Sequence, residues 1–131
     1  MQEAIYSKIN GISGLGAEVY EHVPQGKASM PYVVIGPVDL NDNSTDTEEN
    51  AFDGTFLVHV YSDKRTSKPV AVIQKLIYDN LHLADDLAPT GYGISIVRQE
   101  STNIFTEQDG ITRHGVQVYD IVFEPPITYT Y

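Results

Sequence analysis

The chain has 131 residues, a length that fits one domain with a hydrophobic core of its own. Its 18 acidic residues outnumber 8 basic ones, and the formal net charge of -10 disfavours binding to nucleic acid or anionic membranes, because both need clustered Lys and Arg. The lack of cysteine excludes disulfides, thiolate metal sites and cysteine nucleophiles. Neither a secretory signal nor an apolar run of membrane-spanning length is visible, so we expect a soluble chain made in the cytoplasm.

The first third of the chain predicts one helix and two strands. Three isoleucines recur at helical spacing over residues 2–12 and predict a short amphipathic helix, which a glycine-rich stretch ends. Residues 17–23 and 31–38 predict two strands joined by a polar segment. Residues 39–50 are the most polar part of the chain and predict a loop.

A long strand and the main helix follow. Residues 52–62 alternate large side chains on both faces of the predicted strand: Phe56, Val58 and Val60 on one, Leu57, His59 and Tyr61 on the other. Two occupied faces indicate a central strand or a strand whose second face is covered by an interface. Ser67 and Pro69 form a helix-start signature, a hydroxyl cap with a proline in the first turn, so a helix is predicted over residues 68–83.

The last third predicts a long hairpin. Residues 92–105 and 111–123 read as two strands around Asp109 and Gly110, a strong hairpin-turn dipeptide. Alternation is imperfect near residues 98–100, which indicates a β-bulge.

The predicted order is therefore α-β-β-β-α-β-β. A helix between strands predicts an α+β fold, with an antiparallel-rich or mixed sheet of about five strands and two helices packed on one face. We expect a single domain over residues 1–131, with a flexible C-terminal tail at residues 125–131 that begins with two prolines.

Metal and catalytic sites find little support in the sequence. The four histidines are widely scattered, and none has a second histidine two or four residues away to form a metal pair. Asp39, Asn41 and Asn43 match three ligand positions of a calcium loop, but Ser44 stands where glycine is required and Asn50 where the bidentate glutamate is required. No G-x-S-x-G elbow or paired catalytic carboxylates are present. We expect no enzyme, no cofactor and no catalytic or metal-binding residues.

Charged residues instead indicate contact surfaces. Basic residues gather in the turn before the main helix, and acidic residues gather in the loop that enters the same long strand from its other end. Unlike patches at opposite ends of one element suit head-to-tail contacts between copies. Tyrosines in the C-terminal tail are suited to adding a strand to a neighbour's sheet. The candidate interaction residues are Asp42, Asp46, Glu48, Glu49, Lys64, Arg65, Lys68, Tyr129 and Tyr131.

The order of the segments resembles the tail-completion, or tail-terminator, proteins of long-tailed bacteriophages and prophages. The matching segments are Val19 and Tyr20 followed by Pro24, residues 31–35, residues 58–62, the helical stripe Val70, Ile73, Ile77 and Leu81, and a closing strand over residues 115–123. The resemblance spans nearly the whole chain. The chain departs from the pattern by a long polar insert at residues 41–50 and an extended hairpin around Asp109.

The resemblance implies a structural virion protein that is synthesised in the host cytoplasm and acts at the head-proximal end of the tail. Such proteins form a ring, by resemblance a hexamer, which ends the tail tube and joins it to the head connector. The implied partners are further copies of the chain, the tail tube protein and the connector protein. DNA would pass through the ring without specific binding, because an acidic wall repels it. The alternatives are a head-tail connector or neck protein and, from another class, a small acidic ligand- or calcium-binding module.

Overall fold

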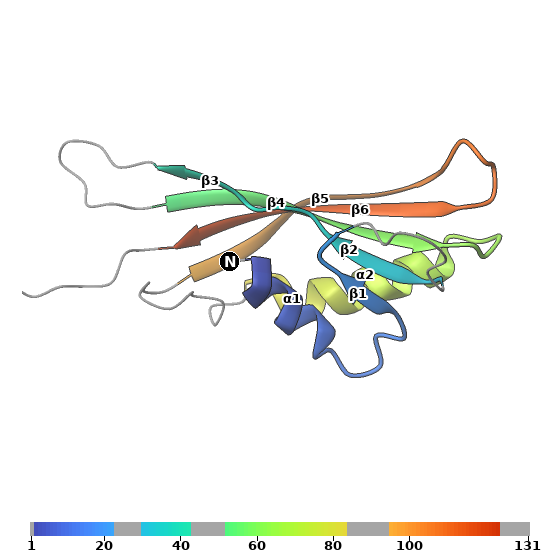
Figure 1. Ribbon diagram of the computed structural model, residues 1–131, viewed down its shortest axis with the longest axis horizontal. Coiled ribbons are helices and arrows are strands. Elements are labelled where there is room, and N and C mark those ends of the chain that lie inside the picture. The colour runs from blue at the N-terminus through green and yellow to red at the C-terminus, as the bar shows by residue number, and fades with distance from the viewer. Residues whose placement is uncertain (1, 23–29, 43–51, 84–94, 124–131) are drawn as a thin grey trace, which may run out of the picture.

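The computed structural model describes residues 2–22, 30–42, 52–83 and 95–123 (Figure 1). The proposed C-terminal tail and most of the acidic insert lie outside these residues. The elements in chain order are α1 (Gln2–Asn10), β1 (Glu18–Tyr20), β2 (Tyr32–Ile35), β3 (Asp39–Asp42), β4 (Phe52–Ser62), α2 (Lys68–Leu81), β5 (Ser95–Thr106) and β6 (Arg113–Phe123). Neither of the two described helices is long and apolar enough to cross a membrane.

The strands form one mixed sheet in the order β1-β2-β4-β6-β5, with β3 as an additional partner of β4. The pairing of β1 with β2 is parallel, and all other pairings are antiparallel. Both α1 and α2 lie against the same face of the sheet (Figure 1). The predicted α+β fold with helices on one face is therefore confirmed.

Strand β3 was not expected, because its residues belong to the segment predicted as a polar loop. Both β2 and β3 pair with the same edge of β4, the first with residues 58–61 and the second with residues 52–55. Between them the backbone N–H of Gly36 donates to the carbonyl of Leu57 at 2.9 Å, so pairing continues past the bend. The long edge of β4 thus holds these polar residues in a strand that their own side chains do not predict.

The face that the helices cover holds the hydrophobic core. Helix α1 buries Ile5 and Ile9 completely, as the helical spacing predicted. From the sheet, alternate residues of β2, β4 and β6 point into the same layer. The fully buried members of the core from these elements include Val33, Ile35, Phe56, Val58, Val60, Tyr119 and Ile121.

Helix α2 buries the stripe that its periodicity predicted, and it ends at Leu81, two residues before the predicted end. Pro69 lies in its first turn. The predicted hydroxyl cap is wrong: Ser67 occupies the cap position, but its side chain makes no capping hydrogen bond. Its backbone carbonyl instead accepts from the N–H of Ala71 at 2.9 Å, which closes the first helical turn.

Gly115 lets α2 approach the sheet closely. It lies in β6 on the helix-covered face, and a Cβ atom at this position would stand 2.4 Å from Nε2 of Gln74 and 2.5 Å from Cγ1 of Val70. Such separations are well inside van der Waals contact, so any larger residue would push the helix outward. The glycine is therefore a packing requirement.

The hairpin turn between β5 and β6 matches the prediction. Oδ1 of Asp109 accepts from the backbone N–H groups of Ile111 and Thr112, both at 2.8 Å. The Thr112 hydroxyl, which donates to Oδ2 of Asp109 at 2.7 Å, and these two backbone N–H groups hold the pKa of Asp109 below its ordinary value. Gly110 follows with φ +73°, a conformation that favours glycine. The pairing register shifts between Gln99 and Ser101, which confirms the predicted bulge.

Candidate interaction surfaces

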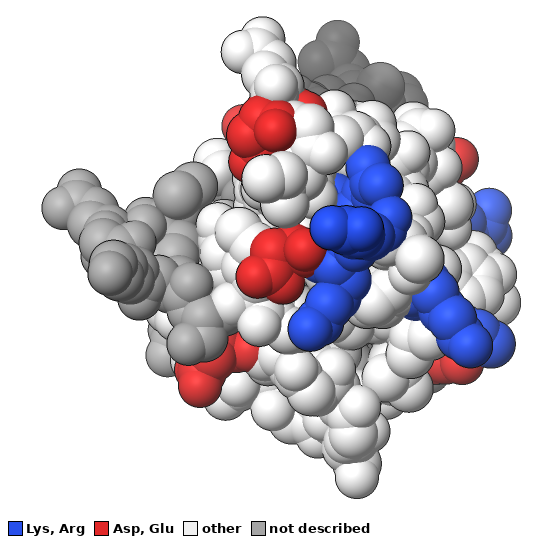
Figure 2. All heavy atoms as spheres, turned by 90° about the vertical axis from the view of Figure 1, so that its right-hand side faces the viewer, with Lys and Arg blue, Asp and Glu red and all other residues white. Residues whose placement is uncertain are grey.

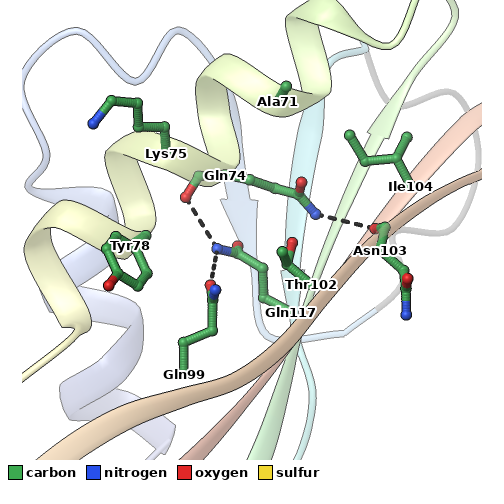
Figure 3. A pocket seen from close by; sticks show the side chains of 9 residues that line it. All are labelled: Ala71, Gln74, Lys75, Tyr78, Gln99, Thr102, Asn103, Ile104 and Gln117. Carbon is green, nitrogen blue, oxygen red and sulfur yellow. Dashed lines mark hydrogen bonds between the residues drawn. The ribbon is translucent and has the colours of Figure 1, made fainter.

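A cavity of about 660 Å³ lies between α2 and the β5–β6 part of the sheet (Figure 3). Amide side chains form its centre. Nε2 of Gln117 donates to the backbone carbonyl of Gln74 at 3.0 Å and to Oε1 of Gln99 at 2.9 Å. Nε2 of Gln74 donates in turn to the carbonyl of Asn103 at 3.3 Å. The network joins the helix to both strands of the hairpin.

The groups that line this cavity hold α2 against the hairpin. Its side-chain amides bond to backbone carbonyls and to one another, and an amide serves as neither acid, base nor nucleophile. The ionisable groups in its lining are Tyr78 and Lys75, and Lys75 pairs with Asp79 at 3.1 Å on the exposed side of the helix. Among the residues that the structure describes, no group of three or more His, Asp or Glu side chains could hold a metal ion.

No described helix covers the opposite face of the sheet (Figure 1). This face carries a row of aromatic rings. We call it the aromatic row: Tyr20 from β1, Tyr32 from β2, Tyr61 from β4, His114 from β6 and Phe105 from β5. The ring centroids lie 5.9, 5.0, 4.3 and 4.7 Å apart in that order. Tyr32, Tyr61, His114 and Phe105 are direct cross-strand partners, so the row crosses β2, β4, β6 and β5 at one level. Tyr20 lies two residues farther along β1, where its register partner is Val34.

Apolar side chains extend this uncovered face beyond the row. Leu57 is 37% exposed, Ile96 42% and Val122 50%, and Phe105 within the row is 46% exposed. Acidic groups border them, and a hydrogen bond with Asp120 raises the pKa of Glu100. A face that combines exposed aliphatic groups with aromatic rings is typical of a protein–protein interface.

Two histidines meet on this face, contrary to the prediction of scattered histidines. Nδ1 of His59 lies 2.8 Å from Nε2 of His114, and Nδ1 of His114 lies 2.6 Å from Oε1 of Glu107. If the carboxylate accepts from Nδ1–H of His114, then Nε2 of His114 is an acceptor and His59 donates to it. Burial and the neighbouring His114 lower the pKa of His59. The two residues are 55 positions apart, so only the β4–β6 register, with both facing outward, could have revealed the pair.

The predicted basic residues lie at one end of the molecule. Lys64, Arg65 and Lys68 are all exposed between the end of β4 and the first turn of α2. A fourth basic residue, Arg113 at the start of β6, lies beside them and was not predicted from the sequence. Its Nη2 donates to the backbone carbonyl of Arg65 at 2.6 Å, and its Nη1 donates to the hydroxyl of Thr106. Figure 2 shows Lys and Arg side chains gathered over this end, with acidic side chains beside them. We call these four residues the basic end.

The acidic insert enters the sheet at the other end of β4. Asp42 closes β3 and pairs with Phe52, the first residue of β4, whereas the basic end follows Ser62, its last. Asp46, Glu48, Glu49, Tyr129 and Tyr131 lie outside the described residues. Because residues 39–42 form an extended strand, they do not adopt the coiled conformation that a calcium loop starting at Asp39 requires.

Comparisons with known proteins show the fold and the family of the chain. No curated protein matches the chain. Among solved structures, a chain from the virion of a native gene transfer agent particle superimposes with a TM-score of 0.81 at 22% identity, over 95% of this chain and 94% of that one. At this identity the likeness shows a shared fold. The family described as "Tail completion protein gp17" matches residues 4–124. The chain therefore belongs to the tail completion protein gp17 family.

Proposed function

We propose that the chain is a structural subunit of a bacteriophage or prophage virion that forms a ring at the head-proximal end of the tail tube. The ring ends the tube and joins it to the head connector, without catalysis and without a cofactor. Family membership supports a role in tail completion. The neighbour from a gene transfer agent virion has the same fold, which is consistent with that role.

The uncovered face of the sheet is the observation that carries the proposal. A strand such as β4 places large side chains on both faces, but helices cover only one of them. Burying apolar surface contributes about 25 cal/mol per Å². Exposed aromatic and aliphatic groups on one face therefore favour association.

Charge supports the same role. The chain has a net charge of -10, so a ring built from it repels DNA. DNA that passes through the ring is therefore not bound by the inner wall. The basic end and the acidic insert are proposed contact surfaces for neighbouring virion subunits, since they lie at opposite ends of β4. Tyr129 and Tyr131 are proposed as further contacts.

Removal of the gene from its phage tests the proposal. We expect heads and tails that do not join, or tails of irregular length, in electron micrographs of the lysate. Adding the purified chain should restore joining and place a density at the head-proximal end of the tail. Tails of normal length joined to heads in the absence of the chain would contradict the proposal, and a density on the head side alone would favour a neck protein.

A further inference from the structure

We propose that copies in the ring join edge to edge, with the free part of β5 in one copy pairing with β1 of the next. The inference rests on the proposed ring and specifies how its copies touch. Adding the edge of one sheet to the next would give a single sheet that runs around the ring.

The edge of β5 is covered over only part of its length. In the first part, the backbone N–H of Gln99 donates to Nδ1 of His82 at 3.1 Å, and the N–H of Leu83 donates to the carbonyl of Val97. The end of α2 therefore closes this stretch. Beyond the bulge, no described strand pairs with the outer edge of residues 101–106.

These six residues lack the usual protection of a free edge. They contain no charged residue and no proline, and they continue as a strand to Thr106. Native sheets normally protect such an edge with a charge, a proline, a bulge or a covering segment, because unpaired N–H and C=O groups attract another strand. The bulge here lies before the uncharged stretch, and no described strand pairs with the edge beyond it. An unprotected edge in a chain that assembles is most simply explained by a strand that pairs with it there.

The opposite edge of the same sheet has the right direction. Following the pairings from β5 through β6, β4 and β2 to β1 shows that β5 and β1 run antiparallel. A β5–β1 contact between copies is therefore an antiparallel pair of the ordinary kind. Because the two edges are unlike, the contact is heterologous, the kind from which a ring forms when the rotation between successive copies closes.

The aromatic row indicates that the strand that pairs with this edge belongs to a second copy of the chain. The row ends with Phe105, 46% exposed, on β5 and with Tyr20 on β1, on the same face of the sheet. Cross-strand neighbours on one face lie about 4.5–5.5 Å apart at Cβ, the spacing at which aromatic rings stack. Edge joining would place Phe105 beside Tyr20 of the next copy, and the row would continue around the ring.

A cysteine pair tests the contact directly, because the chain contains no cysteine. Phages that encode the chain with both Tyr20→Cys and Phe105→Cys would be grown, and their tails purified. Mild oxidation, or a short bis-maleimide that tolerates a two-residue offset, should give a ladder of covalent multimers on a non-reducing gel. Each single variant should give no ladder, nor should Phe105→Cys combined with Tyr78→Cys, which lies on the helix side.

The outcomes separate the two proposals. A ladder that reaches the full ring supports edge joining. A second pair, Tyr20→Cys with Asn103→Cys, would be tested in the same way. Tails that contain the chain but show no multimer with either pair would overturn edge joining without contradicting the proposed ring. Cross-links from Phe105→Cys to a different protein would overturn it as well, by assigning the edge to another occupant. Absence of the wild-type chain from purified tails would overturn the proposed function itself.

Discussion

The two faces of the sheet are built from the same strands but have different surroundings. In β4, Phe56, Val58 and Val60 are fully buried beneath the helices, whereas Leu57, between them in sequence, is 37% exposed on the other face. The helix-covered face contains mainly aliphatic side chains and the stacked pair of Phe56 and Tyr119, with centroids 5.3 Å apart. The uncovered face contains the aromatic row and the histidine pair.

The difference separates folding from assembly. Side chains on the covered face lose their contact with water when the chain folds, so they contribute to the free energy of unfolding. Exposed side chains on the uncovered face, such as Leu57 and Phe105, lose it only when a neighbour arrives. Substitutions on the two faces should therefore be distinguishable by measuring the stability of the isolated chain and its assembly separately.

The largest effect is expected for Phe56→Ala. Removing a fully buried aromatic ring should lower the free energy of unfolding by about 3–5 kcal/mol, because the transfer energy is lost and a cavity remains. Leu57→Ala is the matched control on the adjacent residue, with an expected loss of about 1 kcal/mol or less. Urea denaturation followed by circular dichroism measures both. Equal losses for the two variants would show that both faces are buried in the isolated chain.

The close approach of α2 predicts the next largest effect. Gly115→Ala places a methyl group against Gln74 and Val70 and should cost about 1–3 kcal/mol of stability. Adding Gln74→Ala to the same chain removes one of the two clashing side chains, so part of the loss should be recovered. A Gly115→Ala chain as stable as the wild type in the same urea titration would show that the helix lies farther from β6.

The histidine pair predicts a dependence on pH. The folded-state pKa of His59 is below the ordinary value of 6.5, so the unfolded chain binds the proton more readily. The stability that neutral His59 contributes is then present above about pH 6.5 and is lost as the pH falls below it. His59→Gln should make the urea midpoint less sensitive to pH between 7.5 and 5.5. An unchanged slope in this variant would assign the pH dependence to other groups.

The smallest effect on stability is expected at the basic end. Lys64→Glu with Arg65→Glu should change the free energy of unfolding by less than about 0.5 kcal/mol, because both side chains are exposed. The same variant should weaken attachment to tails at low salt, as counted in electron micrographs. Lys8→Glu with Lys75→Glu changes the net charge equally and should attach normally.

This variant also distinguishes two arrangements of the copies. In an edge-joined ring all basic ends lie on one rim, so charge reversal should weaken joining to the next virion component and leave the ring closed. In a ring built through the charged ends of its copies, reversal should open the ring itself. Light scattering on the isolated ring measures which occurs.

The parts of the structure that depend on local patterns could be predicted from the sequence. The stripe along α2 and the turn at Asp109 each rest on residues within one turn or one hairpin. The bulge at Glu100 could be placed because alternation fails there. The family resemblance rested on the order of such segments, and the family match confirms it.

The parts that depend on pairing between distant segments could not be predicted. Strand β3 exists because β4 offers an edge to polar residues whose own preference is for a loop. His59 and His114 meet only through the β4–β6 register, and Arg113 joins the basic end through the carbonyl of Arg65, 48 residues away. The prediction of a hydroxyl cap at Ser67 was wrong, because the geometry of a cap depends on the backbone that enters the helix.

The uncovered face is most directly tested by one substitution measured in two assays. Phe105→Glu places a charge on the exposed ring position at the end of the aromatic row, and we expect the urea midpoint of the isolated chain to stay close to that of the wild type. In a phage that lacks its own copy of the gene, wild-type chain should restore joined tails of uniform length, and the folded Phe105→Glu chain should not. Full restoration of infectious particles by the folded variant would contradict the assignment of this face to assembly.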